Sequence, residues 1–150
     1  MDVSLPRKVL VAVEGSEPSL KESSMKAARY SLKLATASDA SLVAICVVQI
    51  PEYIEENTRA SLRDELFRKS ERTLEEIKGL ASKSGVKFTS KVIETSGGIS
   101  TAICNFAEEG NIDLVVLGTR SAASSLTKLM LGSVASGVVG NAHCPVLVVR

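Results

Sequence analysis

The chain of 150 residues has the length of one compact domain, which buries roughly two thirds of the surface that its unfolded form exposes. Apolar residues make up 45% of it and charged residues 23%, which argues against disorder. The 18 lysines and arginines nearly balance the 17 aspartates and glutamates, and only two tyrosines and three phenylalanines occur. Neither nucleic acid nor another polyanion is therefore indicated as a partner.

Five short apolar runs are predicted to form strands. In chain order they are residues 8–13, 42–48, 86–93, 113–118 and 145–149. Four of the runs have a continuous apolar character, although two of them begin with a charged residue, and such runs are typical of strands buried on both faces of a parallel sheet. The third run instead alternates Lys87, Thr89 and Lys91 with apolar residues, as expected of an outer strand with one wetter face.

Helical periodicity fills the intervals between these runs. In the first interval Ala27, Ala28 and Ala35 share one face with Ser24 and Ser31, and such small side chains permit close packing on a sheet. The next helices are predicted over about 56–84, over 99–107 and, in the sequence GSVASGVVGNA, over 132–142. Two glycines inside the last helix each cost about 1 kcal/mol relative to alanine, so close packing or ligand approach is needed to explain them. Alternating strands and helices predict a mostly parallel sheet covered on both faces.

The three cysteines, Cys46, Cys104 and Cys144, are widely spaced, and we interpret them as small buried hydrophobic residues. The first residues show no signal-peptide pattern, and no apolar run approaches the roughly 20 residues that a membrane span needs. These features lead us to expect a cytoplasmic protein.

The segment LGTRSAASSLTKLMLGSV, residues 117–134, leaves the carboxyl end of the fourth predicted strand. Ligands of open α/β sheets bind beyond such strand ends. Gly118 would let a phosphate approach the backbone, and Gly132-Ser133 would open a helix whose free N–H groups favour an anion. The segment contains no Walker A pattern, and no GxGxxG follows the first strand. We interpret SGGIS at 96–100 as a turn into the third helix.

The chain resembles the universal stress protein family over essentially its whole length. The resemblance rests on VLVAVEGSEPS near the start, DLVVLGTRS in the fourth strand, LGSVASGVV after the loop and CPVLVVR at the end. It implies a single α/β domain over residues 1–150 with an open parallel five-stranded sheet in the order 3-2-1-4-5. Helices would cover both faces, as in adenine nucleotide alpha hydrolase-like folds.

The resemblance also implies a function. Members of the ATP-binding branch bind ATP or a related adenine nucleotide, with or without Mg²⁺, as homodimeric regulatory or stress-response modules without efficient catalysis. The nucleotide site that it implies here consists of Ala12, Val13, Glu14, Val47, Gly118, Arg120, Ser121, Gly132, Ser133 and Val134.

The loop departs from the family's pattern, which reads glycine, two residues, glycine, nine residues, glycine and serine or threonine. Gly118 and the pair Gly132-Ser133 match it, but Ser121 replaces the second glycine, and ten residues follow it before Gly132. If that position needs φ > 0, serine there costs roughly 1 kcal/mol. Glu14 stands where the family carries an aspartate near the adenine and ribose, and it keeps the carboxylate one methylene farther from the backbone.

Two cations in the loop are candidates for phosphate contacts. Arg120 is well placed for bidentate bonds, and a phosphate contact and a solvated surface position remain equally open for it. For Lys128 we prefer the solvated position.

The other chemistry-bearing residues suggest no second site. His143 lies beside Cys144, but no further ligand stands at metal spacing and no Ser/His/Asp set can be assembled, so we expect a helix-end histidine. The acidic segment PEYIEEN, residues 51–57, is either a solvated loop or a site for a cation or partner. We predict no catalytic and no metal-binding residues.

Three functions remain open. We favour a nucleotide-binding regulatory module over a protein-interaction module of the same fold, for which the replaced glycine argues. A slow ATPase or phosphotransferase ranks third, because no convincing base or Mg²⁺ carboxylate accompanies the loop. Since residues 145–149 are apolar throughout, they are predicted to pair two copies if they form an outer strand.

Overall fold

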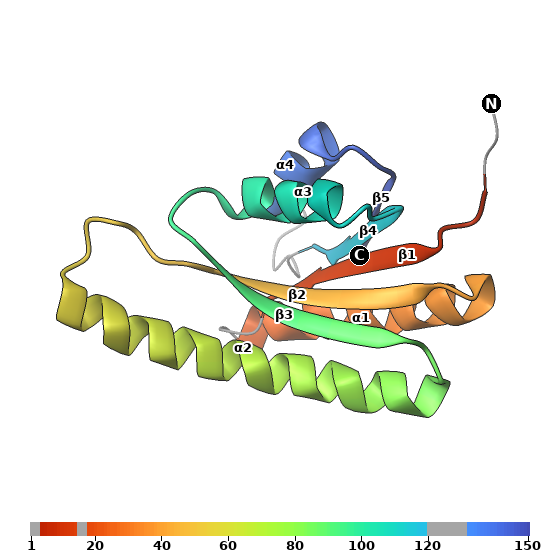
Figure 1. Cartoon of the computed structure of the whole chain (residues 1–150), viewed down its shortest axis with the longest axis horizontal. Helices are drawn as coiled ribbons and strands as arrows, with labels where there is room; N and C mark the ends of the chain where they lie inside the picture. Colours follow the sequence, from red (N-terminus) through yellow and green to blue (C-terminus); the bar gives the residue numbers. More distant parts are fainter. Residues whose placement is uncertain (1–3, 15–17, 120–131) are drawn as a thin grey trace.

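The computed structural model describes residues 4–14, 18–119 and 132–150. Strands and helices alternate along them (Figure 1). The strands are β1 (Lys8–Val13), β2 (Ser41–Gln49), β3 (Phe88–Thr95), β4 (Leu114–Gly118) and β5 (Val146–Val149). The helices are α1 (Pro18–Ser38), α2 (Glu56–Ser84), α3 (Ile99–Glu109) and α4 (Ser133–Asn141).

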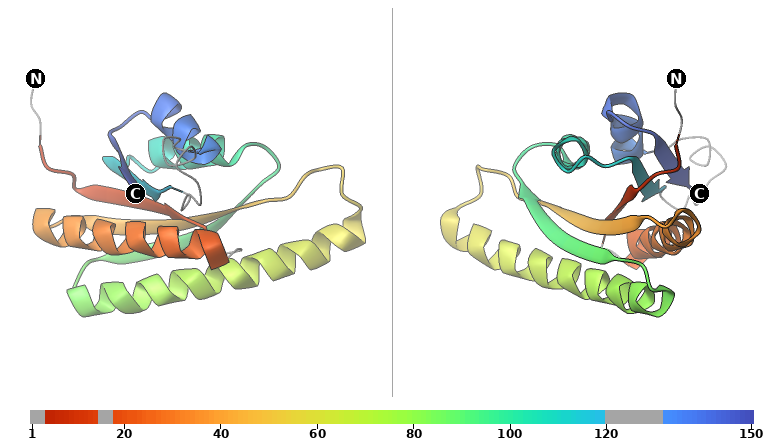
Figure 2. Two further views of the ribbon diagram at one scale, coloured as in Figure 1. Left: turned by 180° about the vertical axis from the view of Figure 1, so that it is seen from behind. Right: turned by 45° about the vertical axis from the view of Figure 1, so that its right-hand side comes forward.

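The five strands form one parallel sheet in the order β3-β2-β1-β4-β5, which confirms the predicted fold and strand order. Helices α1 and α2 lie on one face and α3 and α4 on the other (Figures 1 and 2). The outer strands are β3, as its alternating pattern predicts, and β5. The strand order reverses between β1 and β4, because β2 and β3 extend the sheet from β1 while β5 extends it from β4.

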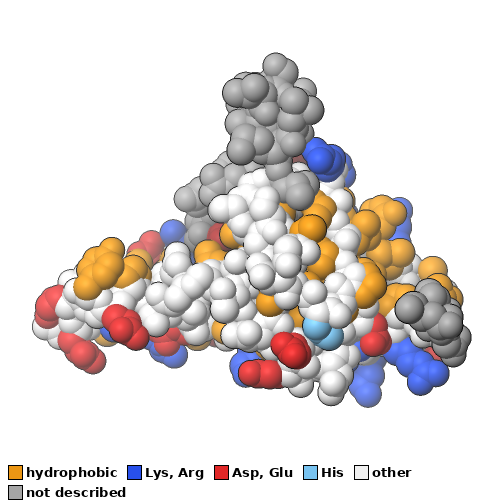
Figure 3. All heavy atoms as spheres, turned by 90° about the horizontal axis from the view of Figure 1, so that it is seen from above, with side chains coloured by type: hydrophobic (Ala, Val, Ile, Leu, Met, Phe, Trp, Pro, Cys, Tyr) orange, Lys and Arg blue, Asp and Glu red, His pale blue; other side chains and the backbone are white. Residues whose placement is uncertain are grey.

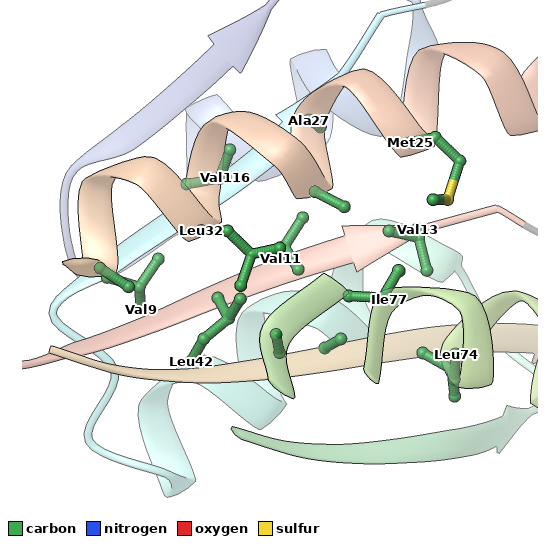
Figure 4. Packing of buried hydrophobic residues seen from close by; sticks show 14 of the residues in the cluster. Val9, Val11, Val13, Met25, Ala27, Leu32, Leu42, Leu74, Ile77 and Val116 are labelled. Carbon is green, nitrogen blue, oxygen red and sulfur yellow. The ribbon is translucent and has the colours of Figure 1, made fainter. Parts of the chain in front are cut away.

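The larger apolar core lies between the sheet and helices α1 and α2 (Figure 4). Val9 and Val11 of β1 are fully buried there, and Ile77 of α2 is buried beside them. The small side chains of Ala27 and Ala28 let α1 pack closely on the strands, as its small-residue stripe predicts. This packing fixes the position of α1 relative to the ends of β1 and β4.

A second core lies on the opposite face, under α3 and α4. Ile103 and Ala107 of α3 pack there with Val138 of α4 and with Leu10 and Val115 of the sheet. The amino ends of β1 and β4 are joined by the carboxylate of Asp113, whose Oδ2 accepts hydrogen bonds from the backbone N–H groups of Arg7 and Lys8 at 3.0 and 2.9 Å.

The element boundaries differ from the predicted ones by at most two residues. β3 occupies Phe88–Thr95 in place of the predicted 86–93. α4 forms in spite of its glycines, and at Gly137 the reason is close packing, since a Cβ there would lie 2.5 Å from the hydroxyl oxygen of Ser100. SGG is a turn before α3, as predicted.

The cysteine prediction holds for two of the three thiols. Cys46 and Cys104 are buried, whereas Cys144 is only partly buried. Burial raises the pKa of the Cys104 thiol, and burial together with the charge of Asp113 raises the pKa of the Cys144 thiol. Such thiols are less reactive at neutral pH than exposed ones. None of the described helices combines the length and the hydrophobicity that crossing a membrane requires.

Candidate functional site

The carboxyl ends of β1 and β4 border a cavity at the point where the strand order reverses. Strand ends at such a point diverge into loops on opposite faces of the sheet, and the crevice between them is where α/β proteins hold ligands. The cavity has a volume of about 160 Å³. Its lining consists of Ala12, Val13, Glu14, Ser23, Ser24, Val47, Ile99, Ile103, Leu117, Gly118, Thr119 and Val134.

The end of β1 is fixed by a side chain of α1. The backbone N–H of Glu14, the first residue after β1, donates a hydrogen bond to Oγ of Ser24 at 2.7 Å. Only 6% of the Ser24 surface is exposed, so water competes little for this bond. Glu14 is thereby held at the cavity wall.

The end of β4 lies directly against α1. A Cβ atom at Gly118 would lie 2.5 Å from Oγ and 2.6 Å from the backbone oxygen of Ser23. Real Cβ atoms essentially never come this close to such atoms, so position 118 has no room for a side chain. The close packing of α1 therefore explains why residue 118 is a glycine. The sequence suggests a different reason, namely that a glycine there lets a phosphate approach the backbone.

The amino end of α4 forms another part of the site. Gly132 stands just before the helix with φ 87° and ψ 162°, a conformation that side-chain-bearing residues rarely adopt. The N–H groups of the first helical turn, beginning at Ser133, have no partner within the helix. Val134 of the same turn lines the cavity, so this polar helix end lies beside it.

The lining of the cavity is mostly apolar, and its polar side chains come from α1 and from the residues that follow β1 and β4. Val47, Ile103 and Leu117 supply hydrophobic walls that suit a flat ring system. Hydroxyl groups come from Ser23, Ser24 and Thr119. Within the described lining, Glu14 is the single ionisable side chain, and its carboxylate accepts hydrogen bonds from hydroxyl or amino groups.

Most of the site residues expected from the sequence meet here. The cavity brings together Ala12, Val13, Glu14, Val47, Gly118 and Val134. Gly132 and Ser133 stand beside Val134 at the start of α4 but are not among the residues that line the cavity. Arg120, Ser121 and Lys128 lie outside the described residues.

Other lining residues were missed at the sequence level. Ile99 and Ile103 belong to the apolar face predicted for the third helix. Nothing in the sequence distinguishes these two residues, which line the cavity, from the other apolar residues of that face. The sequence places Ser24 only in the packing stripe of the first helix, and it carries no signal for Ser23. A pair of adjacent hydroxyl residues in the helix that follows β1 is the one pattern that could have identified them.

The remaining candidates lie outside the lining of the cavity. His143 is exposed and lies just after α4, close to the predicted helix end. In the acidic segment, Glu55 caps α2 by accepting a hydrogen bond from the N–H of Asn57, and Glu52 accepts one from the hydroxyl of Ser96. No group of three or more His, Cys, Asp or Glu residues that could hold a metal ion occurs in the described part of the chain.

Known proteins with similar sequences are universal stress proteins. One from Methanocaldococcus jannaschii is 33% identical over 150 residues, which covers 98% of this chain and 84% of the relative. YxiE of Bacillus subtilis is 30% identical, and the match covers 95% of this chain and 98% of YxiE.

Solved structures with the same fold carry the same description. UspA of Lactobacillus plantarum superposes with a TM-score of 0.83 at 23% identity, covering 99% of this chain and all of that one. A universal stress protein in complex with cAMP has a TM-score of 0.72 at 23% identity and coverages of 98% and 99%. One from Arabidopsis thaliana with AMP bound has a TM-score of 0.69 at 22% identity and coverages of 96% and 91%.

The family model of the universal stress proteins matches residues 6–150, nearly the whole chain. Together with the relatives at 30% identity and above, this match shows that the chain belongs to the universal stress protein family.

Proposed function

We propose that this protein binds an adenine nucleotide at the cavity between β1 and β4 and acts as a regulatory module in a stress response. The observation that carries the proposal is that residues from four elements and from the end of β1 line one cavity. They are Ala12 of β1, Glu14 just after β1, Val47 of β2, Gly118 of β4 and Val134 of α4. Related structures with cAMP and AMP bound support adenine nucleotides as the ligand class.

The cavity fits part of such a ligand. Its apolar walls suit the base, and the carboxylate of Glu14 suits sugar hydroxyl groups. The volume of about 160 Å³ is below the range of roughly 300–1,000 Å³ that complete small-molecule sites occupy. The phosphates would therefore extend beyond it, toward the free N–H groups at the start of α4.

We propose a binding protein in place of an efficient enzyme. Within the described lining Glu14 is the only residue with an ionisable side chain, and the hydrogen-bonding role given above already employs its carboxylate. ATP, its Mg²⁺ and a cytoplasmic location stay predictions at this stage. Sustained hydrolysis of ATP that disappears in Ser133→Ala would contradict the proposal.

The test of binding is isothermal titration of nucleotide-free protein with Mg-ATP and with AMP. Ala12→Ile places a larger side chain in the cavity while keeping good strand propensity, and it should abolish detectable binding. Val139→Ile is the matched control, because Val139 is 49% exposed on α4. Gly132→Val is a poorer probe, because the positive φ at residue 132 strains the backbone of any residue other than glycine.

The second candidate is a protein-interaction module of the same family that does not bind nucleotide. It is favoured by Ser121 and by the longer spacing to Gly132. Absence of heat from the wild type at millimolar ATP and AMP, with radiolabelled ATP also unbound, would select it over the nucleotide-binding function.

A further inference from the structure

Helices α3 and α4 lie side by side on one face of the sheet (Figure 1), and one serine and one glycine bring them close together. A Cβ atom at Gly137 of α4 would lie 2.5 Å from Oγ and 2.7 Å from Cβ of Ser100 in α3. Ordinary contacts of a Cβ atom begin at 3.4 Å. The Oγ atom could turn away by a change of rotamer, but the Cβ atom is fixed to the backbone of α3. The two helices therefore lie this close because residue 137 has no side chain.

Both residues of this contact stand next to residues that line the cavity. Ile99 directly precedes Ser100 in the first turn of α3, and it lines the cavity together with Ile103. Val134 lines the cavity from α4 and lies one turn before Gly137. The contact between the two helices therefore sets how far the wall formed by α4 stands from the wall formed by α3.

The core under the two helices makes this spacing rigid. Ala135 and Val138 of α4 are buried in the same core as Ile103 and Ala107 of α3. Close-packed interiors transmit strain from one group to the next. A side chain forced into position 137 would therefore displace the start of α4 as a unit, together with the cavity wall that it forms.

We propose that Ser100 and Gly137 are positioning residues that set the spacing of the α3 and α4 walls and, with it, the size of the base that the cavity accepts. This inference rests on the proposed nucleotide binding. Neither residue belongs to the described lining, so each acts through a neighbour, Ile99 or Val134. In an apolar pocket one methylene more or less changes affinity about 10- to 200-fold. The ligand class that follows is a nucleotide whose adenine carries no substituents.

The experiment compares the affinities for AMP, N6-methyl-AMP and 2-chloro-AMP by isothermal titration of nucleotide-free protein. The two analogues carry one extra group at different edges of the base. The wild type should bind at least one of them about tenfold more weakly than AMP. In Gly137→Ala the new Cβ pushes α4 away from α3, so AMP loses contact with the wall while the larger base gains room. The preference for AMP over that analogue should fall about threefold or more.

The preference separates positioning from stability, because a general loss of stability lowers the affinities together and leaves their ratio unchanged. Gly140→Ala makes the same chemical change in α4, where a Cβ meets no described atom within 4 Å, and it should keep the wild-type preference. The double variant Gly137→Ala with Ser100→Gly removes both atoms that the new Cβ would meet, and it should restore the preference. Ser100→Gly alone removes the spacer between the helices and should also lower the preference, which gives a second test should Gly137→Ala not fold.

The outcomes distinguish this inference from the proposed function. A wild type that binds none of the three nucleotides overturns the proposed function, and this inference with it. A wild type that binds all three equally leaves nucleotide binding intact and overturns the role of the wall spacing. The positioning role is also overturned if Gly137→Ala and Ser100→Gly keep the wild-type preference, or if the double variant does not restore it.

Discussion

At the scale of single residues, Gly118 shows how packing and a ligand site can require the same residue for different reasons. The sequence places it at the end of an apolar strand, where a glycine suggests phosphate approach. In the structure the space that its side chain would need is filled by Ser23. The contact includes the backbone oxygen of Ser23, so no change of the Ser23 side chain would make room.

Gly118→Ala is therefore predicted to destabilise the protein by about 1–3 kcal/mol, because either α1 or the end of β4 must move. Gly140→Ala is the control: it lies inside α4, and a Cβ there meets no atom within 4 Å. That substitution should be neutral or stabilising by up to about 1 kcal/mol. Urea denaturation of both variants measures the difference, and equal stabilities would contradict the packing argument.

The sequence predicts the site in two ways. Gly118 follows from its place at a strand end, whereas Glu14 follows from the resemblance to the family, and the structure brings both to one cavity. Ser23 and Ser24 could not be predicted, because a serine that supports a neighbouring backbone and a serine that merely fills a small space in a helix have the same pattern. Their contacts depend on how α1 packs across two strands.

At the scale of elements, the two halves of α2 are stabilised differently. The second half contains the buried residues Ser70, Thr73, Leu74, Ile77 and Ala81. The first half, residues 56–69, contains none. It is supported by local contacts instead, such as the ion pair between Glu65 and Lys69 at 3.1 Å and Arg63 over the ring of Phe67 at 4.3 Å. Pairs of this kind contribute a few tenths of a kcal/mol each.

We therefore predict that α2 unfolds locally from its amino end. In native-state hydrogen exchange, backbone amides of residues 60–69 should exchange faster than those of 74–84, whose protection should approach that of global unfolding. Ile77→Ala should cost about 2–5 kcal/mol and Leu62→Ala less than about 1 kcal/mol, since Ile77 is fully buried and Leu62 only partly. Uniform protection along α2 would contradict this division.

β3 shows why element boundaries were harder to predict than elements. The predicted strand ends at Ile93 because that is its last apolar residue. In the structure the strand continues through Glu94 and Thr95, which pair with Val48 and Gln49 of β2. Backbone pairing with a longer neighbour extends a strand regardless of side-chain polarity. Apolar periodicity therefore revealed that the strand exists and lies at an edge, whereas its register depended on β2.

At the scale of the whole molecule, the two outer strands of the sheet have opposite character. β3 carries Lys91 and other polar side chains, which disfavour pairing with another strand. β5 is composed of Val146, Leu147, Val148 and Val149, and the first three remain partly exposed. Seen from the side of α3 and α4, hydrophobic side chains also reach the surface among polar ones (Figure 3). An apolar strand with one free edge is a surface that a second copy of the same chain would cover.

We predict a homodimer in solution with β5 at its interface, and Val148→Lys as the variant that dissociates it. A lysine on this strand places a charge where two copies would meet and blunts the free edge, as edge lysines commonly do. Thr89→Lys makes the same kind of change on β3, the opposite outer strand, and should leave the dimer intact. Light scattering at micromolar concentration should give twice the chain mass for the wild type and Thr89→Lys and one chain mass for Val148→Lys. A monomeric wild type would contradict dimerisation itself, whereas a Val148→Lys variant that stays dimeric would move the interface away from β5.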